Sequence, residues 1–427
     1  MIKKWLKNDF LKSVLVLMTG TVLAQIFGFL ISPILTRIYT PEQMGELNIY
    51  LRAVSFIAAL ATARYELSLP LPKSEQHAYL LYRLSFRIAR NIFIVCILAS
   101  GIYLLTVDFS RATFWLIFFV LISSVAVVFS NLGTNWAIRT KQFKRISFFR
   151  MSNSLINNSL KWVFGVFGLG TIGLLLASFI GSTLSTLPFL KDWLKIRKQY
   201  TPFHSKPKTK VLIRAYREFP MVNLPHVLVD YGKDLLLAFF MVFYFSKEVF
   251  GWYSHSYMIL QLPIALIGAA IGQVFFNKCA ELVNEGKSTV GILKKTVRTL
   301  FLISILPFSV LFFFGEDLFA FVFGQNWRES GVYSEIMSIW FFMSFMTSVT
   351  STLPTILRRQ KQFFVLGIIS AVIQIFCFGV LPMLIGKTDE SFITILYVVS
   401  IIQSIFFIYV LIRIFAYARA GVLPESR

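Results

Sequence analysis

Apolar runs of about 20 residues recur along the whole chain, and a run of that length is what an α-helix needs to cross a bilayer. The segments between these runs are short and charged, and none is long enough to form a separate domain. Of the 427 residues, 56% are hydrophobic and only 15% are charged, whereas soluble domains carry about 25% charged residues. The sequence therefore predicts an all-α polytopic membrane protein without a water-soluble domain.

Runs bounded by charges, Gly or Pro predict twelve transmembrane helices. The first run is too long for a signal-peptide core, so we expect it to be retained as a helix. The helices are expected near residues 13–38, 44–68, 86–107, 113–138, 150–168, 171–190, 218–245, 251–276, 296–314, 333–357, 362–385 and 391–412.

The basic residues lie between the runs in a strongly asymmetric way. Alternate segments on one side hold 33 of the 42 Lys and Arg residues, and the segments on the other side hold five. By the positive-inside rule, the richer side is cytoplasmic and both termini lie there. The formal charge of +22 is thus explained by topology, and a nucleic-acid partner is not expected.

An internal repeat divides the chain around a basic segment that contains two prolines. Residues 40–45 (TPEQMG) resemble 246–251 (SKEVFG), and 139–143 (RTKQF) resemble 359–363 (RQKQF), each following an equivalent predicted helix. Because six helices precede the second copy, the repeat is parallel, as in transporters that work by alternating access. We expect a six-helix bundle, a cytoplasmic linker and a second six-helix bundle at residues 1–190, 191–217 and 218–427.

Residues that carry soluble-enzyme chemistry are not found in recognisable patterns. Cys96, Cys279 and Cys377 are scattered without a CxxC pair or nearby His ligands, so neither a disulfide nor a metal site is expected. Phosphate-loop, HExxH, GxSxG and dinucleotide motifs are missing from the sequence. We therefore expect no catalytic residues, no cofactor and no enzymatic activity.

The seventh predicted helix carries the densest polar stripe, in which Asn223, His226, Asp230, Lys233 and Asp234 share one helical face. Charged groups at this depth are costly in lipid and mark either a substrate pathway or a structural cluster. A self-neutralising cluster that fixes this helix to a neighbour is the alternative. We favour the functional interpretation because Asp230 falls near the middle of the predicted span.

Two further helices place basic groups inside the bilayer. The fifth carries Arg150, Asn153, Asn157 and Lys161 on one face, with Lys161 near mid-membrane. Arg52 lies about 12 Å from the outer end of the second helix, too deep to reach the interface easily. Arg64 and Glu66 are expected at the inner end of that helix, where snorkelling to the interface explains them.

Several short motifs resemble the bacterial polysaccharide flippase family of the multidrug/oligosaccharidyl-lipid/polysaccharide exporter superfamily. The most specific are residues 35–45 (LTRIYTPEQMG) and 64–72 (RYELSLPLP), with 250–253 (FGWY) and 272–276 (GQVFF) in the second half. The resemblance covers essentially the whole chain. It implies twelve helices in two six-helix bundles that form a V around a central cavity.

The resemblance also implies a function in the cell inner membrane. Members flip undecaprenyl-pyrophosphate-linked oligosaccharides from the cytoplasmic to the periplasmic leaflet for O-antigen or related polymers, with polysaccharide polymerase machinery as a further partner. Arg52, Lys161 and Lys233 are then candidates for binding the pyrophosphate, because arginine and lysine suit phosphate oxygens. Coupling to a proton or sodium gradient, for which Asp230 and Asp234 are candidates, is left open.

Three alternatives remain open at the level of sequence. A multidrug or cation antiporter of the same fold would need acidic residues in the cavity, where basic residues slightly outnumber acidic ones. A membrane-embedded polymerase is the weaker alternative, because the longest outer loop holds Arg328 as its one basic residue. A scaffold without transport is a third interpretation.

Overall fold

The computed structural model describes residues 9–106, 110–200 and 206–422, and these are helical throughout apart from short connections, with no strand among them. Each of the twelve ranges predicted to be helical contains a helix. The longer helices are α2 (Asp9–Ile38), α3 (Pro41–Ala61), α4 (Glu75–Thr106), α5 (Arg111–Arg139), α6 (Phe143–Val166), α7 (Gly170–Tyr200), α8 (Lys206–Ala215), α9 (Leu224–Tyr244), α10 (Lys247–Pro263), α11 (Ala269–Asn284), α12 (Val290–Phe323), α13 (Arg328–Thr350), α15 (Gln360–Gly379) and α17 (Asp389–Ala420). The shorter ones are the 3-10 helices η1 (Tyr65–Ser68) and η5 (Gln325–Trp327), the π-helices η3 (Phe219–Asn223) and η4 (Ile264–Gly268), and α14 (Leu353–Ile356) and α16 (Leu381–Ile385).

Within the described residues, nine helices are long and apolar enough to cross a membrane, or up to ten if one bent pair forms a single span. The chain is therefore an all-α polytopic membrane protein. The nine do not include α6 or α9, which are the two helices that carry most of the candidate polar residues. The charged residues of α6 and α9 lower the mean hydropathy of these two helices. The count of twelve membrane crossings stays a prediction.

The chain divides into two compact units, which are described separately here. Unit 1 comprises residues 1–39 and 46–235, and unit 2 comprises residues 40–45 and 236–427. The boundary falls inside α9. Residues 191–217, expected to be a linker, contain the end of α7 and helix α8, and the division into bundles at residues 190 and 218 stays a prediction.

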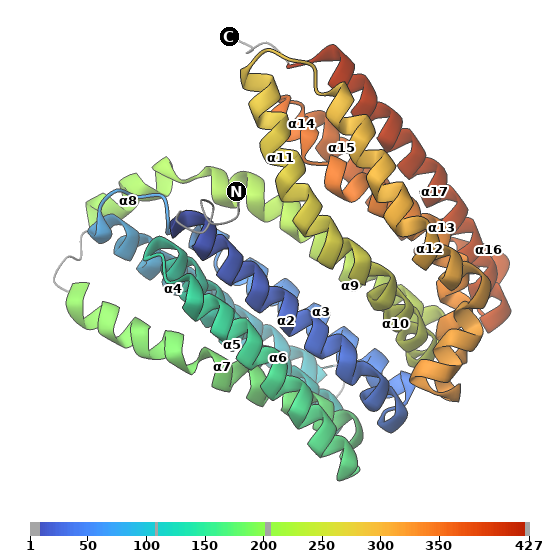
Figure 1. Ribbon diagram of the computed structural model, residues 1–427. Coiled ribbons are helices and arrows are strands. Elements are labelled where there is room, and N and C mark those ends of the chain that lie inside the picture. Colours follow the sequence, from blue (N-terminus) through green and yellow to red (C-terminus); the bar gives the residue numbers. More distant parts are fainter. Residues whose placement is uncertain (1–8, 107–109, 201–205, 423–427) are drawn as a thin grey trace. The chain divides into compact units, whose positions relative to one another are not determined.

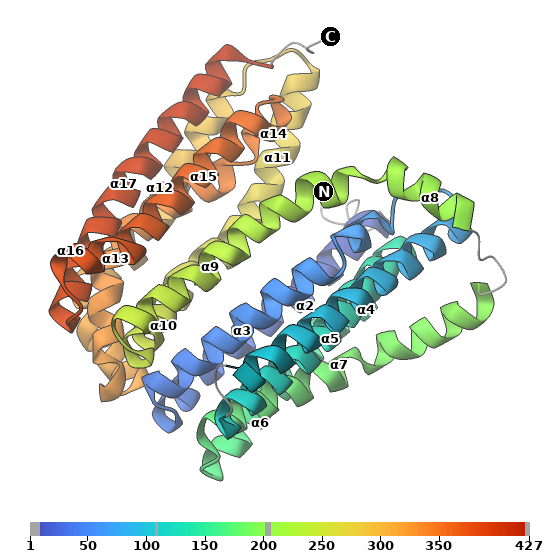
Figure 2. The same cartoon turned by 180° about the vertical axis from the view of Figure 1, so that it is seen from behind.

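In unit 1, α6 runs along α2 on one side and along α7 on the other, as Figures 1 and 2 allow the reader to follow. Small residues permit the close approach. A Cβ at Gly20 would collide with the side chain of Ser147, and one at Gly181 would stand 2.9 Å from the Cα of Asn157. Close helix packing through small residues is typical of membrane proteins, where lipid provides no hydrophobic drive between helices.

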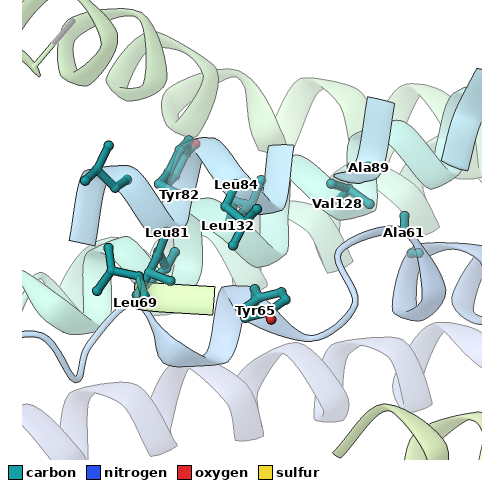
Figure 3. Close-up of a cluster of buried hydrophobic side chains, with 12 residues drawn as sticks. Ala61, Tyr65, Leu69, Leu81, Tyr82, Leu84, Ala89, Val128 and Leu132 are labelled. Carbon is teal, nitrogen blue, oxygen red and sulfur yellow. The ribbon is translucent and has the colours of Figure 1, made fainter. Parts of the chain in front are cut away.

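The connection between α3 and α4 is a buried turn, and here the predicted helix 44–68 is wrong at its end. Helix α3 ends at Ala61, because Ala63 and Arg64 adopt left-handed backbone angles (φ 48° and 63°) before η1 begins. Tyr65 and Leu69 then pack with residues of α4 and α5 in a buried cluster, which Figure 3 shows. Glu66 has a side chain only 2% exposed, so snorkelling to the interface does not explain it.

In unit 2, α12 packs along α13, and α13 also contacts α17 and α10 (Figure 2). At the tightest point, Gly315 and Gly331 face each other, and a Cβ on either would clash with the backbone of the other helix. Helix α10 ends at Pro263, and the π-helix η4 follows it at once. Together α10, η4 and α11 form the bent pair, with an angle of 44°.

Candidate functional site

Three of the predicted site residues of unit 1 meet between α3 and α9. The guanidinium of Arg52 donates a hydrogen bond to the main-chain carbonyl oxygen of Asp234 (2.8 Å), and its Nη1 lies 4.0 Å from the carboxylate Oδ1. Lys233 Nζ lies 3.4 Å from the same Oδ1. One carboxylate oxygen is therefore shared by two cationic groups, and this cluster has one excess positive charge. We call Arg52, Lys233 and Asp234 the α3–α9 cluster.

Near this cluster, α3 and α9 are also in ordinary van der Waals contact. Gly232 faces Phe56, whose ring lies 3.7 Å from where a Cβ would stand. The side chains of Arg52 and Lys233 are 20% and 18% exposed, and that of Asp234 is 40% exposed. A guanidinium carries five N–H donors and an ammonium three, so the cluster keeps accessible donors after its internal contacts are made.

A second pair lies one to two turns earlier on α9. His226 Nδ1 is 3.2 Å from Asp230 Oδ2, and both side chains are more than half exposed. Asn223, expected on the same α-helical face, lies in the π-helix η3 instead. The predicted spacing assumed a continuous α-helix, and a π turn has more residues per turn. That turn ends at Asn223, however, and the residues from Leu224 to Asp230 are α-helical, so the predicted common face of Asn223 and Asp230 stays a prediction.

The predicted residues of α6 make contacts of a different kind. Toward α2, Arg150 donates to Thr21 Oγ1 and Ser154 donates to the carbonyl of Ala24 (2.7 Å). Asn157 lies against Gly181 of α7, and its buried Oδ1 has no hydrogen-bond partner within the described residues. Asn153 is half-buried. Arg150, expected on one face with Asn157, is thus engaged with α2.

Lys161 is half-buried near the C-terminal end of α6. Its main-chain carbonyl accepts a hydrogen bond from the Tyr39 hydroxyl (2.7 Å), which ties the helix to the end of α2. Among the described residues, its ammonium makes no hydrogen bond or ion pair. The structure thus brings Arg52 and Lys233 together on Asp234, whereas Lys161, Asn153 and Asn157 belong to a helix that packs on α2 and α7.

A basic pocket of unit 1 was missed at the level of sequence. The third helix is predicted at 86–107, but α4 already begins at Glu75 and carries three arginines of the pocket on one helical face, while the fourth, Arg197, lies on α7. The i, i+4, i+7 spacing of Arg83, Arg87 and Arg90 was the available signal. Over the described part of the chain, no three His, Cys, Asp or Glu side chains form a group that could hold a metal, and the three cysteines are free.

Comparison with known proteins gives a family match and a fold match. A family model described as "Polysaccharide biosynthesis protein" matches residues 34–332. No curated protein matches the sequence. The chain is similar in structure to the lipid II flippase MurJ in an inward closed conformation, with a TM-score of 0.69 and 12% identity over 95% of this chain and 90% of that one.

Multidrug transporters have the same fold. An inward-facing multidrug resistance MATE family transporter of the MOP superfamily has a TM-score of 0.67 at 13% identity, over 94% of this chain and 95% of that one. A MATE structure in the bent conformation has a TM-score of 0.51 at 13% identity, over 97% of this chain and 98% of that one. Identities this low establish the fold alone, so the substrate has to be inferred from the residues of this chain.

Proposed function

Because the chain belongs to the polysaccharide biosynthesis protein family whose model matches residues 34–332, we propose that it is a flippase for lipid-linked oligosaccharides. The substrate we propose is an undecaprenyl-pyrophosphate-linked repeat unit, moved by alternating access from the cytoplasmic to the periplasmic leaflet for O-antigen or another surface polysaccharide. The similarity in fold to a lipid II flippase supports a lipid-linked substrate. The protein then acts in the cell inner membrane, with both termini cytoplasmic and a polymerase as downstream partner.

The observation that carries this proposal is the excess of cationic donors over carboxylates in the α3–α9 cluster. Arg52 and Lys233 both approach Oδ1 of Asp234, and all three side chains are partly accessible. A pyrophosphate offers more acceptor oxygens than one carboxylate, so it competes for the same two donors. Asp234 then holds the basic groups in place until the substrate arrives, and Lys161 supplies a further cation on α6.

The membrane potential is an adequate energy source for such a substrate. If two negative charges cross unneutralised from an inside-negative cytoplasm, about 4–5 kcal/mol is released at 100 mV. Proton or sodium coupling is the alternative, and the exposed His226–Asp230 pair is the feature that favours it. That pair is also the specific observation behind our second candidate, a multidrug or cation antiporter.

The decisive experiment compares variants of the α3–α9 cluster in a strain that lacks its own flippase. Arg52→Ala and Lys233→Ala are expected to lower surface polysaccharide and to raise intracellular lipid-linked repeat units at unchanged protein abundance. Lys161→Ala tests the third basic group in the same way. Lys278→Ala is the matched control, because Lys278 is an exposed lysine of α11 paired with Glu281 (2.9 Å).

Replacement of the acidic partner separates the two candidate functions. In a flippase, Asp234→Asn removes a competitor of the pyrophosphate and leaves the main-chain carbonyl that binds Arg52, so surface polymer is maintained. In a cation antiporter, the same change removes a group that binds the cation and abolishes exchange. Loss of polymer with Asp234→Asn but not with Arg52→Ala would therefore contradict the role of the α3–α9 cluster as the pyrophosphate site, and absence of polymer with the wild type would contradict the flippase. A change in polymer length with normal flipping would instead indicate a polymerase.

A further inference from the structure

Four arginines and four aromatic side chains of unit 1 line one pocket between α4 and the end of α7. The cavity has a volume of about 380 Å³, which lies within the range of small-ligand sites. Its lining residues are Tyr79, Tyr82, Arg83, Phe86, Arg87, Arg90, Trp193 and Arg197. Not one of these eight residues is acidic, so the pocket is a concentrated positive site.

The guanidinium groups of Arg83 and Arg87 are available to a ligand. Both side chains are half-buried, and within the described residues neither makes an ion pair or a hydrogen bond. Arg90 is exposed and donates to the side chain of its neighbour Asn91 (3.2 Å). Three arginines at i, i+4 and i+7 repel one another on a helix, and a bound anion relieves that repulsion.

Two carboxylates on the same helices, Asp192 on α7 and Glu75 on α4, are already paired. Asp192 is paired with Arg145 at 2.6 Å, and Arg145 is not among the lining residues. Glu75 accepts a hydrogen bond from the hydroxyl of Tyr200. Both acids therefore have partners outside the pocket.

The aromatic residues fix the shape of the site. Phe86 stacks on Trp193 with ring centroids 5.4 Å apart, and Arg197 lies over the same indole at 5.4 Å. A guanidinium held on an aromatic face is oriented before a ligand arrives, which lowers the entropic cost of binding. This arrangement suits phosphate, because arginine binds phosphate oxygens bidentately.

The ridge of α4 that carries the arginines continues as an apolar ridge. Ile94, Leu98 and Ile102 follow at intervals of four residues, and their side chains are 49%, 62% and 63% exposed. These residues lie in a helix that meets the criterion for a membrane span, so their exposed faces contact lipid chains. A ligand with a phosphate in the pocket and an acyl or prenyl chain along this ridge contacts both the basic pocket and the apolar ridge. A soluble phosphate contacts the basic pocket alone.

We propose that the pocket between α4 and α7 binds the phosphate-bearing headgroup of a membrane lipid. Basic pockets between membrane helices at the cytoplasmic side are a known physical setting for such headgroups. An anionic phospholipid and a polyprenyl pyrophosphate share this chemistry, and the experiment distinguishes them. The site stands apart from the α3–α9 cluster, and the proposal holds whether or not the protein is a flippase.

The test is native mass spectrometry of the purified full-length protein with added lipid. Cardiolipin, phosphatidylglycerol and undecaprenyl pyrophosphate are compared with zwitterionic phosphatidylcholine. The double variant Arg83→Gln/Arg87→Gln is expected to bind the anionic lipids about tenfold more weakly than the wild type, with phosphatidylcholine unchanged. Lys294→Gln/Lys295→Gln is the matched control, because it removes two exposed charges of α12 in unit 2.

The outcomes divide clearly. Preference for undecaprenyl pyrophosphate identifies the substrate lipid as the occupant, and preference for cardiolipin or phosphatidylglycerol identifies a bilayer lipid. Equal losses in the two double variants, or equal binding of phosphatidylcholine, overturn the proposal. Displacement of lipid by soluble pyrophosphate at equal concentration contradicts the role of the apolar ridge. If the double variant does not fold, Arg83→Lys/Arg87→Lys is used, and its loss of bidentate contacts is expected to weaken binding by a smaller factor.

Discussion

Gly45 and Gly251 occupy equivalent positions in two segments that pack against each other reciprocally within unit 2. A Cβ on Gly251 would collide with the main-chain carbonyl of Pro41, and a Cβ on Gly45 would collide with that of Lys247. Each glycine is thus the fifth residue of its helix and meets the first residue of the other. The two segments are the ones in which the sequence repeat was found.

Replacement of either glycine by alanine is expected to destabilise unit 2. The methyl group would meet a backbone carbonyl, which cannot rotate away as a side chain could. Overpacking of this kind costs about 1–3 kcal/mol, and we expect a lower unfolding temperature for Gly45→Ala and for Gly251→Ala. Thermal unfolding of the detergent-solubilised protein, followed by size-exclusion fluorescence, measures the effect.

Gly367→Ala is the control for this prediction. Gly367 is also inside a helix of unit 2, but a Cβ there has open space within 4 Å. Alanine favours helix over glycine, so this variant should be as stable as the wild type or more stable. Equal unfolding temperatures for all three variants would contradict the close contacts of Gly45 with Lys247 and of Gly251 with Pro41.

The helices were predictable because hydropathy and N-terminal capping both mark them. The side chains of Thr40 and Gln43 exchange hydrogen bonds with each other's main-chain N–H at the start of α3, and Ser246 accepts from Val249 N at the start of α10. The repeat at these two caps is therefore in structural register. The end of α3 was not predictable, because the left-handed turn at Ala63 and Arg64 contains neither Gly nor Asn.

The second repeat match is out of structural register. Lys141 has a φ of 57° and precedes the first residue of α6 by two positions, and Arg358, with a φ of 59°, precedes the first residue of α15 by two. The sequence match instead pairs Lys141 with Lys361, three residues further on. Short basic segments on the same side of a membrane resemble each other because of their topology as well as common descent. The identity of these two segments therefore did not show which of their residues are structurally equivalent.

The candidate site could be predicted only in part. Sequence indicates that Arg52 lies deep in the membrane, but its partner Asp234 is 182 positions away in the chain. Two polar groups of opposite charge at similar depth give no information about which helices are neighbours. Asn157 shows the same limit. Its position on one face of α6 does not reveal that Gly181 of α7 is its neighbour.

Glu66 is expected to make stability depend on pH. It lies outside the candidate membrane spans, and burial raises the pKa of its carboxyl, an effect that Arg64 at 3.2 Å only partly offsets. A raised folded-state pKa means that the stabilisation is fully present below the unfolded pKa, near 4.5, and is lost as pH rises through the folded value. We therefore expect the unfolding temperature of Glu66→Gln to match that of the wild type at low pH and to exceed it at about pH 8.

The measurement is a series of unfolding temperatures between about pH 4.5 and pH 8 for both proteins. Glu281→Gln provides a control, because Glu281 is an exposed carboxylate paired with Lys278. Its difference from the wild type should stay small over the whole range. A wild type that becomes more stable than Glu66→Gln as the pH rises would mean that the ion pair with Arg64 outweighs burial.

His255 is expected to tolerate replacement by phenylalanine. Its ring is buried, with centroids 4.6 Å from those of Phe323 and Trp327, and its Nε2 has no hydrogen-bond partner within the described residues. Removal of an unsatisfied buried nitrogen without loss of the ring contacts should be neutral or stabilising. His255→Asn, which keeps polarity and loses the ring, should lower the unfolding temperature. Destabilisation by His255→Phe would indicate a hydrogen bond to bound water.

Tyr417 is expected to stabilise unit 2 mainly through its ring. The guanidinium carbons of Arg359 and Arg413 lie 5.2 and 5.3 Å from its centroid, and the hydroxyl accepts a long hydrogen bond of 3.4 Å from Arg413. Each cation–π contact contributes about 0.5–2 kcal/mol, depending on solvation. Tyr417→Phe keeps the π face and should change the unfolding temperature little, whereas Tyr417→Leu leaves both guanidinium groups without it and should lower the temperature clearly. Because leucine retains most of the apolar volume, a difference between the two variants measures the aromatic contribution, and equal effects would instead assign the stabilisation to the hydroxyl.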